Sequence, residues 1–316
     1  MDEGLIKKPL AKNDIKINGK DDIVGSSSVT PFLVFSTFVA GFASFTFGCA
    51  TGYSSAAEAG IVADLGLSTA QYSLFGSIMT LGSMFGAIAC GKLADLLGRK
   101  SAMLVMDIFF ILGWLAIIFA ETAFLLHLGR FSLGIGAGIF AYLSPVYVAE
   151  IAPKNLRGGF ASALQMMTGI GVSLTYFIGN VIAWRTLAVI GALPCLLLLL
   201  GLFFIPESPR WLAKYGNEKQ LKDTLQRLRG VNVDVTEETT EIRDSTETLH
   251  HLSRSRFVEI FERKYGLSLI VVIGTMVIVP LAGSMAIMFY ASSIFKVAGS
   301  SISFDSSLCF GLTFTG

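Results

Sequence analysis

The chain has 316 residues, of which 53% are hydrophobic and only 15% are charged, and its formal net charge is +1. Several apolar runs reach the ~20 residues that cross a bilayer core about 30 Å thick, which excludes an ordinary soluble domain. The near-zero net charge also argues against a nucleic-acid-binding surface.

The predicted elements begin with a polar, lysine-rich segment, residues 1–31, which is expected to be a disordered cytoplasmic tail. Residues 32–205 hold six apolar runs, which predict a bundle of six membrane-spanning helices. The predicted spans are Phe32–Tyr53, Tyr72–Ala94, Ser101–Ala120, Phe124–Val148, Gly159–Val181 and Trp184–Ile205.

The second part of the chain starts with residues 206–265, which are rich in charge. Helical patterning in Glu218–Arg229 and Glu237–Leu252 predicts a cytoplasmic loop of short helices there. Residues 266–295 predict a seventh span, and the tail 296–316 contains no run long enough to cross a membrane.

Loop charges predict the orientation of the spans. The connection 54–71 contains acidic residues but no Lys or Arg, whereas the connections 92–100 and 154–157 are basic. Because basic loops stay in the cytoplasm, the N-terminus is predicted to be cytoplasmic, and seven spans would place the C-terminus outside the cytosol.

Several residues inside the spans require an explanation. The glycines of the second and fourth spans predict close helix packing rather than a nucleotide loop, because apolar residues surround them. Pro145 is expected to kink the fourth helix or to end its regular hydrogen bonding. Asp107 is costly within the third span, so it should face the bundle or be protonated, in a structural or a functional role. The four cysteines show no metal-ligand spacing and are Cys49, Cys90, Cys195 and Cys309. The first three are interpreted as packing residues within apolar runs.

The elbow Gly91–Lys100 joins the second and third spans. It has a glycine suited to a sharp turn, an acid at a helix end and three basic residues, although an ordinary basic loop could look the same. This stretch resembles the signature loop of the major facilitator superfamily. Further stretches resemble its sugar-porter branch: Gly129–Phe131 with Gly134–Gly138, Pro145–Gly158 and Pro206–Leu212. The sequences of Asp64–Gly76 and Phe203–Lys214 are similar to those of plant sugar transporters named for early response to dehydration.

The resemblance, which covers about residues 32–295, implies an all-α membrane protein with the major facilitator fold. In that fold two six-helix halves, each built from inverted three-helix repeats, enclose a sugar site at mid-membrane. This chain would supply the N-terminal half, the cytoplasmic helical loop and a seventh helix. The end after residue 295 therefore looks truncated.

The resemblance also implies a latch at the cytoplasmic ends of the helices, where ion pairs close the inner gate. Partly buried pairs can break and reform with a modest net change in free energy, although solvated helix-end charges are the alternative. The residues that match the latch are Asp95, Arg99, Glu150, Arg157, Glu207 and Arg210.

Sugar contacts are implied at Gln165, whose amide suits a polyol but could be structural, and at Tyr290, as a gate lid. The family's glutamine pair and asparagine in the seventh helix are replaced by Val279, Pro280 and Met285. Such losses should weaken sugar discrimination.

Proton coupling in the family uses an acid in the first span that pairs with the arginine matching Arg130. Here the matching position is Ala50, and an alanine cannot carry a proton. The resemblance therefore implies a uniporter rather than a proton symporter.

The leading expectation is a transporter that moves monosaccharides by alternating access, through facilitated diffusion, in the plasma or vacuolar membrane. Its partners would be a monosaccharide and the lipid bilayer, with no cofactor, no metal and no nucleic acid. The alternative is a truncated product that does not transport, and that associates with or interferes with full-length relatives. An enzyme has little support, because the sequence shows no nucleophile–base constellation.

Overall fold

The computed structural model describes residues 29–230, 233–252 and 263–283, together with residues 287, 289, 290 and 294. The tail predicted over 1–31 lies outside this part except for its last three residues, and the segment 296–316 lies outside it entirely. The regular structure of the described residues is helical. The helices are α1 (Pro31–Leu65), α2 (Thr69–Leu97), α3 (Arg99–Ile118), α4 (Ala123–Ile151), α5 (Arg157–Gly179), α6 (Trp184–Phe204), α7 (Pro209–Tyr215), α8 (Glu218–Arg229), α9 (Thr236–Leu252) and α11 (Arg263–Leu281).

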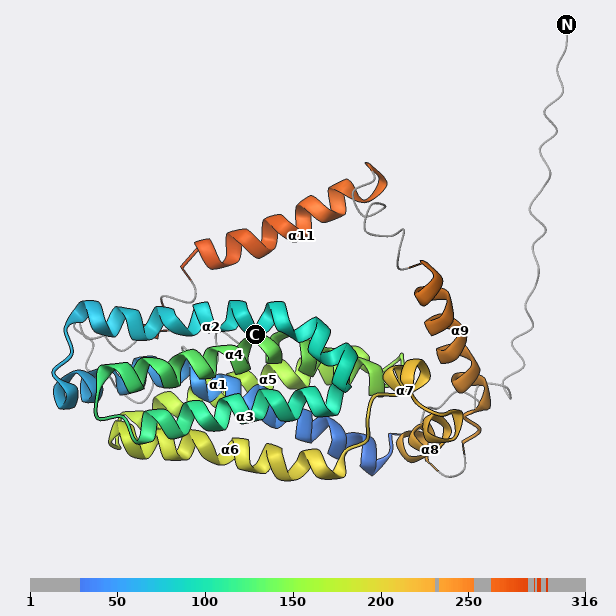
Figure 1. Cartoon of the computed structure of the whole chain (residues 1–316), viewed down its shortest axis with the longest axis horizontal. Helices are drawn as coiled ribbons and strands as arrows, with labels where there is room; N and C mark the ends of the chain where they lie inside the picture. Colours follow the sequence, from blue (N-terminus) through green and yellow to red (C-terminus); the bar gives the residue numbers. More distant parts are fainter. Residues whose placement is uncertain are drawn as a thin grey trace, which may run out of the picture.

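Six helices, α1 to α6, are long and apolar enough to cross a membrane. The helices α2 to α6 begin and end within three residues of the predicted spans. They lie along one another as a bundle (Figure 1). The six-helix half predicted from the sequence is therefore confirmed.

The first helix is longer than predicted. α1 continues past Tyr53 to Leu65, so the loop expected to begin at residue 54 is wrong over its first part. The extension is helical because it buries one side against the bundle, including Ile61. It ends at Gly66, whose φ of 61° is a left-handed conformation that glycine adopts without steric cost. Hydropathy predicted the end of the apolar run, at Tyr53. The helix itself ends later, at Leu65.

The bundle is held together by pairs of helices that approach closely. α2 packs along α4, and α1 packs along α5. A Cβ atom at Gly82 or Gly86 would overlap backbone atoms of α4, and one at Gly134 or Gly138 would overlap the backbone of α2. The packing role predicted for these glycines is confirmed, because only a missing side chain lets the two backbones come so close.

The fourth helix passes through Pro145 and continues to Ile151. This agrees with the predicted span, which also runs past Pro145, and the predicted kink or loss of regular hydrogen bonding stays a prediction. α4 reaches the end of the bundle where α7, α8 and α9 gather (Figure 1).

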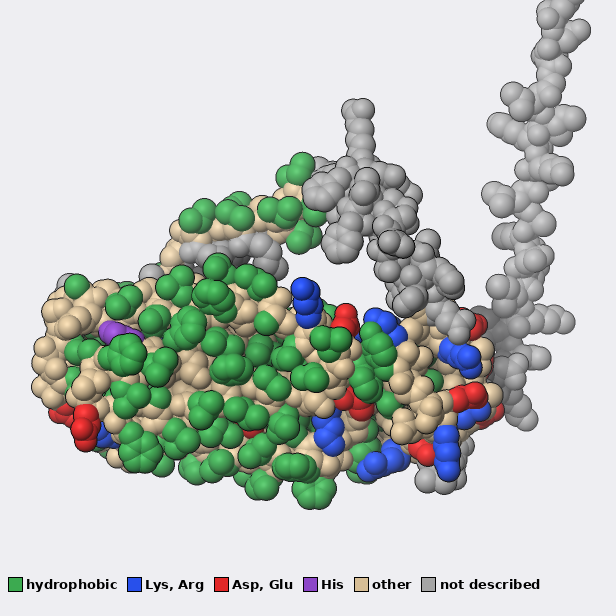
Figure 2. Space-filling view, viewed as in Figure 1, with side chains coloured by type: hydrophobic (Ala, Val, Ile, Leu, Met, Phe, Trp, Pro, Cys, Tyr) green, Lys and Arg blue, Asp and Glu red, His purple; other side chains and the backbone are tan. Residues whose placement is uncertain are grey.

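The helices α7 to α9 form a small layer with its own apolar core. Leu221 and Leu225 of α8 are buried together with Leu212 of α7 and Val235. Charged side chains crowd this end of the molecule, whereas hydrophobic side chains cover the side of the bundle (Figure 2). That distribution is typical of a bundle whose sides face lipid and whose basic end faces the cytoplasm.

The helix α11 covers the first part of the predicted seventh span, Leu267–Phe295. It lies on the α2 side of the bundle and apart from it (Figure 1). Its apolar side chains are exposed on all sides, as the four consecutive residues 270–273 show. A seventh span stays a prediction, because most of the segment after Gly283 lies outside the described residues.

Candidate functional site

The elbow between α2 and α3 consists of a single residue, Gly98. Its φ of 91° is a conformation that residues with a side chain rarely adopt. A Cβ atom at this position would also lie 2.9 Å from the Cδ atom of Glu207. Both the backbone angle and the space therefore require glycine here.

Glu207 takes over the capping that Gly98 cannot provide. Its Oε1 accepts hydrogen bonds from the backbone N–H groups of Arg99 (2.8 Å) and Lys100 (3.1 Å) at the start of α3, and from that of Ser208 (2.8 Å). A negative charge at a helix N-terminus is favourable, because the helix dipole is positive there. Burial raises the pKa of the Glu207 carboxyl above its usual range, although these N–H donors oppose the shift.

Arg99 forms the centre of the cluster at this end. Its guanidinium binds Glu150 of α4 through two parallel bonds, Nε to Oε2 at 3.0 Å and Nη2 to Oε1 at 3.1 Å. The two side chains are only 11% and 9% exposed. Ser208 donates a further bond of 2.5 Å to Oε2 of Glu150. One bidentate pair thus joins α3, α4 and the segment before α7.

Asp95 is the outer member of this cluster. Its Oδ1 lies 3.4 Å from Nη1 of Arg99, and its side chain is 56% exposed. Its backbone carbonyl accepts a hydrogen bond of 3.0 Å from the Trp211 indole. Asp95 therefore stabilises the cluster more through its backbone than through its charge.

Two of the predicted latch residues lie outside the cluster. Arg157 donates to the carbonyl of Ala152 at 3.4 Å. Arg210 is exposed, and no ion pair joins it to another described residue. The structure therefore brings together four of the six predicted residues, Asp95, Arg99, Glu150 and Glu207.

The layer of α7 to α9 is tethered beside this cluster. Arg229 of α8 binds Glu238 of α9 through bonds of 3.0 and 2.7 Å, and its Nη1 donates to the carbonyl of Ile151 at 2.9 Å. Lys154 forms an exposed ion pair with Glu241, which lowers the pKa of the Glu241 carboxyl. α8 and α9 are thus fixed to the C-terminal end of α4.

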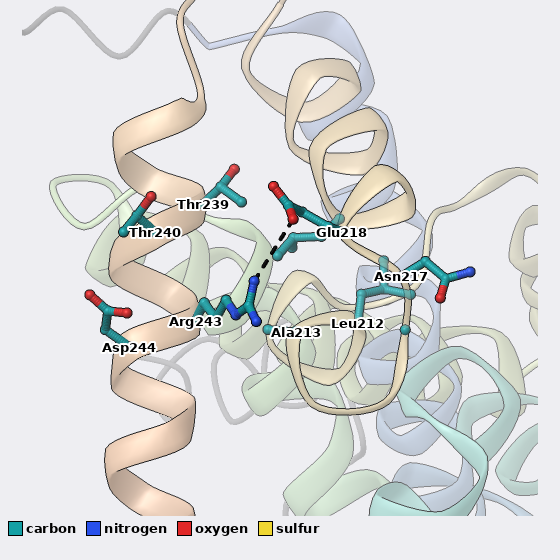
Figure 3. A pocket seen from close by; sticks show the side chains of 10 residues that line it. Leu212, Ala213, Asn217, Glu218, Thr239, Thr240, Arg243 and Asp244 are labelled. Atoms are coloured by element: carbon teal, nitrogen blue, oxygen red, sulfur yellow. Dashed lines mark ion pairs between the residues drawn. The ribbon is translucent and has the colours of Figure 1, made fainter.

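A pocket of about 650 Å³ lies within this layer, between α7, α8 and α9 (Figure 3). Arg243 of α9 reaches across it toward Glu218 of α8, with 3.8 Å between Nη1 and Oε2. Most of the surface that lines it is polar. No group of three or more His, Cys, Asp or Glu within the described ranges could hold a metal ion there or elsewhere.

The other end of the bundle holds a fully buried arginine, Arg130 of α4. Its Nη1 donates to the carbonyl of Ala50 at 2.7 Å, and its Nη2 donates to the Ser54 hydroxyl. The guanidinium lies over the rings of Phe75, at 5.0 Å, and Phe289, at 5.9 Å. Its Nε has no hydrogen-bond partner among the described residues. The structure therefore places Arg130 in contact with Ala50. The groups that accept its hydrogen bonds are the Ala50 carbonyl and the Ser54 hydroxyl rather than a carboxylate.

Of the two predicted sugar-binding residues, Gln165 lies on α5, whereas Tyr290 lies after the end of α11. Tyr290 covers α2, where its hydroxyl would be 3.2 Å from a Cβ atom placed on Gly76, and its ring meets that of Tyr72 edge-on. Gln165 lies on the exposed side of α5, and its amide bonds to no other described residue. Both side chains keep donors and acceptors available, and no contact joins the two.

The replaced sugar contacts of the seventh helix are only partly described. Val279 and Pro280 belong to α11, and Met285 lies outside the described residues. Their predicted effect on sugar discrimination stays a prediction.

Sequence reasoning missed three residues of these clusters, namely Ser54, Ser208 and Trp211. Ser208 and Trp211 stood inside the quoted stretch Pro206–Leu212. Ser54 lies one helical turn after Ala50, a spacing that places both side chains on one face. That spacing was a usable signal, but it was hidden because residue 54 was assigned to a loop.

Comparison with known proteins identifies the family. Residues 32–315 match the model of the family described as "Sugar (and other) transporter". The chain belongs to this family. It is 46% identical to "Sugar transporter ERD6-like 17" of Arabidopsis thaliana over 98% of this chain and 64% of the relative. It is 48% identical to "Sugar transporter ERD6" of the same plant over 95% of this chain and 60% of the relative. The chain therefore spans less than two thirds of the length of these sugar transporters.

Solved structures show the same fold. A major facilitator proton:xylose symporter, XylE bound to 6-bromo-6-deoxy-D-glucose, superposes with a TM-score of 0.74 at 23% identity, over 90% of this chain and 66% of that one. A partially occluded inward-open form of XylE from E. coli superposes with a TM-score of 0.69 at 21% identity, over 89% and 70%. The chain is thus a multi-pass membrane protein that contains the N-terminal half of the major facilitator fold, in a family of transporters rather than enzymes.

Proposed function

We propose that the protein moves monosaccharides across a membrane by alternating access, as facilitated diffusion rather than proton symport. The relatives that share nearly half of its residues are named sugar transporters, which supports the substrate class. The contact between Arg130 and Ala50 carries the proposal for the coupling mode.

Coupling to protons needs a group that gains and loses a proton during the cycle. The groups that hold the guanidinium of Arg130 are a backbone carbonyl and a hydroxyl, neither of which titrates in the physiological range. No ion pair joins Arg130 to a carboxylate within the described residues. The arginine therefore has no partner there whose charge would follow the proton gradient.

Gln165 and Tyr290 are proposed to contact the sugar. An amide offers two donors and an acceptor, and a phenol offers one donor and an acceptor, which together suit the hydroxyls of a sugar ring. Both side chains are accessible on the bundle. Truncation of Gln165 to alanine should therefore weaken sugar binding more than it changes the stability of the bundle.

The cluster of Arg99, Glu150 and Glu207 is proposed to hold the inner ends of the helices together in one state of the cycle. Its charges are almost buried yet lie at the edge of the bundle, so water could replace the partners when the helices separate. A pair of this kind has a Coulomb gain and a desolvation cost that largely offset each other. The latch can thus open without a large change in free energy.

Uptake of labelled hexose tests the proposal in a chimera in which this chain continues into the remaining part of the ERD6 relative. The chimera is expressed in cells that lack hexose carriers. Saturable uptake that a protonophore leaves unchanged is the expected result. The 316-residue chain by itself is expected to give no saturable uptake, because a site between two halves needs walls from both.

Ala50→Asp is the informative variant, since it places a titratable group beside Arg130. It should make uptake depend on external pH, while Ala50→Asn, of the same size, should not. Accumulation by the unaltered chimera that a protonophore abolishes would contradict facilitated diffusion. A chimera that reaches the membrane but transports no hexose would contradict sugar transport itself.

A further inference from the structure

A carboxyl group lies without a partner in the interior of the bundle. Asp107 of α3 is fully buried, and neither of its oxygens has a hydrogen-bond partner in the described part of the chain. It takes part in none of the ion pairs formed by the described residues. A buried carboxyl group normally has at least one such partner, so this one requires an explanation.

Two other helices contribute polar groups at the same place. The thiol of Cys195 on α6 donates to the carbonyl of Gly191 and lies within electrostatic range of the Asp107 carboxyl, beside Thr46 of α1. Thr46 is itself fully buried, and its hydroxyl has no hydrogen-bond partner among the described residues. Three helices thus bring an acid, a hydroxyl and a thiol together within an apolar core.

The surroundings of Asp107 contain no positive charge. Besides Asp107, the ionisable group that acts on the Cys195 thiol of α6 is the Cys49 thiol of α1. α4 faces this level of α3 with small residues, since Gly136 packs on the Phe110 ring. A carboxylate in a membrane interior needs a cation or hydrogen-bond donors to offset its desolvation. Among the described residues, no ion pair and no hydrogen bond reaches either oxygen of Asp107.

We propose that Asp107, Thr46 and Cys195 form a proton-binding site, in which Asp107 is kept as a neutral carboxylic acid. The proton removes the charge that burial disfavours, and the resulting O–H becomes a donor for the Thr46 hydroxyl or the Cys195 thiol after a small side-chain rotation. The site lies between α1, α3 and α6. It is separate from Arg130 and Ala50, and α3 and α6 run on the side of the bundle away from α11 (Figure 1).

The bound proton couples the packing of α3 and α6 to pH. Above the usual pKa range of an aspartate, the unfolded chain has lost this proton while the folded bundle retains it. The folded state then binds more protons than the unfolded state, so its stability falls as pH rises. This consequence does not depend on how the protein transports sugar.

Infrared spectroscopy of the full chain in lipid nanodiscs tests the protonation directly. The spectrum at neutral pH should contain the C=O band of a protonated carboxyl group, and Asp107→Asn should remove it. Asp223→Asn, which changes an exposed aspartate of α8, should leave the band in place. A band that persists unchanged in Asp107→Asn, or its absence from the unaltered protein, would overturn the proposal.

Thermal unfolding provides a second readout that does not require Asn to fit the site. The unfolding temperature of the unaltered chain should fall by about 3–5 °C per pH unit over the range in which the unfolded chain has lost this proton and the folded bundle still retains it. Asp107→Asn and Asp107→Leu should both remove that dependence, whatever their absolute stability. A slope shared by all three proteins would contradict a proton at this site. So would a rise in unfolding temperature with sodium but not with choline, because the carboxylate would then hold a cation.

Discussion

The two ends of the bundle each hold a buried arginine, and the two are satisfied in different ways. Arg99, at the cytoplasmic end, has a carboxylate partner in Glu150 and lies at the edge where water can reach it. Arg130, at the other end, is fully buried and is held by a carbonyl, a hydroxyl and aromatic rings. The first arrangement can exchange its partner for water, whereas the second stays charged and has no titrating partner. This difference supports the proposal that the Arg99 end is the one that opens and closes.

The largest effect in this comparison is expected from Glu150→Ala. The substitution leaves the Arg99 guanidinium almost buried and without its bidentate partner, which should destabilise the protein by about 3–5 kcal/mol. Thermal unfolding in detergent micelles measures the loss. Asp95→Asn is the matched control, because that carboxylate is 56% exposed and lies 3.4 Å away, and it should change stability by less than about 0.5 kcal/mol. Equal losses of stability from the two substitutions would show that burial of the Arg99–Glu150 pair does not determine its contribution to stability.

An intermediate effect is expected from Gly98→Ala at the same end. Alanine would have to adopt φ near 91° and would press against Glu207, so the loss should be about 1–3 kcal/mol. Gly91→Ala, in the same elbow stretch, is the control, because a Cβ atom there meets nothing within 4 Å. It lies inside α2, where alanine should stabilise the helix by about 0.5–1 kcal/mol. Losses of stability of similar size at both glycines would contradict the explanation that the backbone angle of Gly98 and its closeness to Glu207 require glycine.

The smallest effect is expected at the outer end, from Arg185→Gln. Arg185 pairs with Asp64 at 3.4 Å, and both side chains are about half exposed. A pair of this kind contributes about 0–1 kcal/mol and weakens as salt is added. Unfolding temperatures at low and high salt should therefore converge for the unaltered chain and the variant. A loss as large as that of Glu150→Ala would mean that the outer end also depends on an ion pair.

Much of the fold could be predicted from the sequence, because the relevant signal is local. Apolar runs long enough to cross a bilayer located α2 to α6, and the leucine spacing in Glu218–Arg229 located α8 with its bounds. The glycines of α2 and α4 indicated close packing because their chemistry leaves few other uses inside a span. Where local signals conflicted, the prediction was wrong. α1 runs past Tyr53, since tertiary packing outweighed the local preference.

The candidate site was predicted less completely, because its contacts join distant parts of the chain. The resemblance supplied Arg99, Glu150 and Glu207 as residues of one end, and the structure shows that they meet. The resemblance did not predict that Arg157 and Arg210 lie outside the cluster that contains Asp95 and Arg99. Their positions depend on where α5 and α7 begin relative to α3 and α4, which no local pattern encodes.

By itself, the sequence determined that the chain enters a membrane, how many times its first half crosses, and which end carries the positive charge. These properties follow from hydropathy, length and loop charge, each of which is a sum over neighbouring residues. Only the tertiary structure decided which groups satisfy each buried charge. Glu207 caps a helix more than one hundred residues earlier, Arg130 meets Ala50 eighty residues away, and Asp107 meets no charge at all. The physical reason is that the free energy of a buried charge depends on the partners that packing brings within about 3 Å, and that distance is set by the whole bundle.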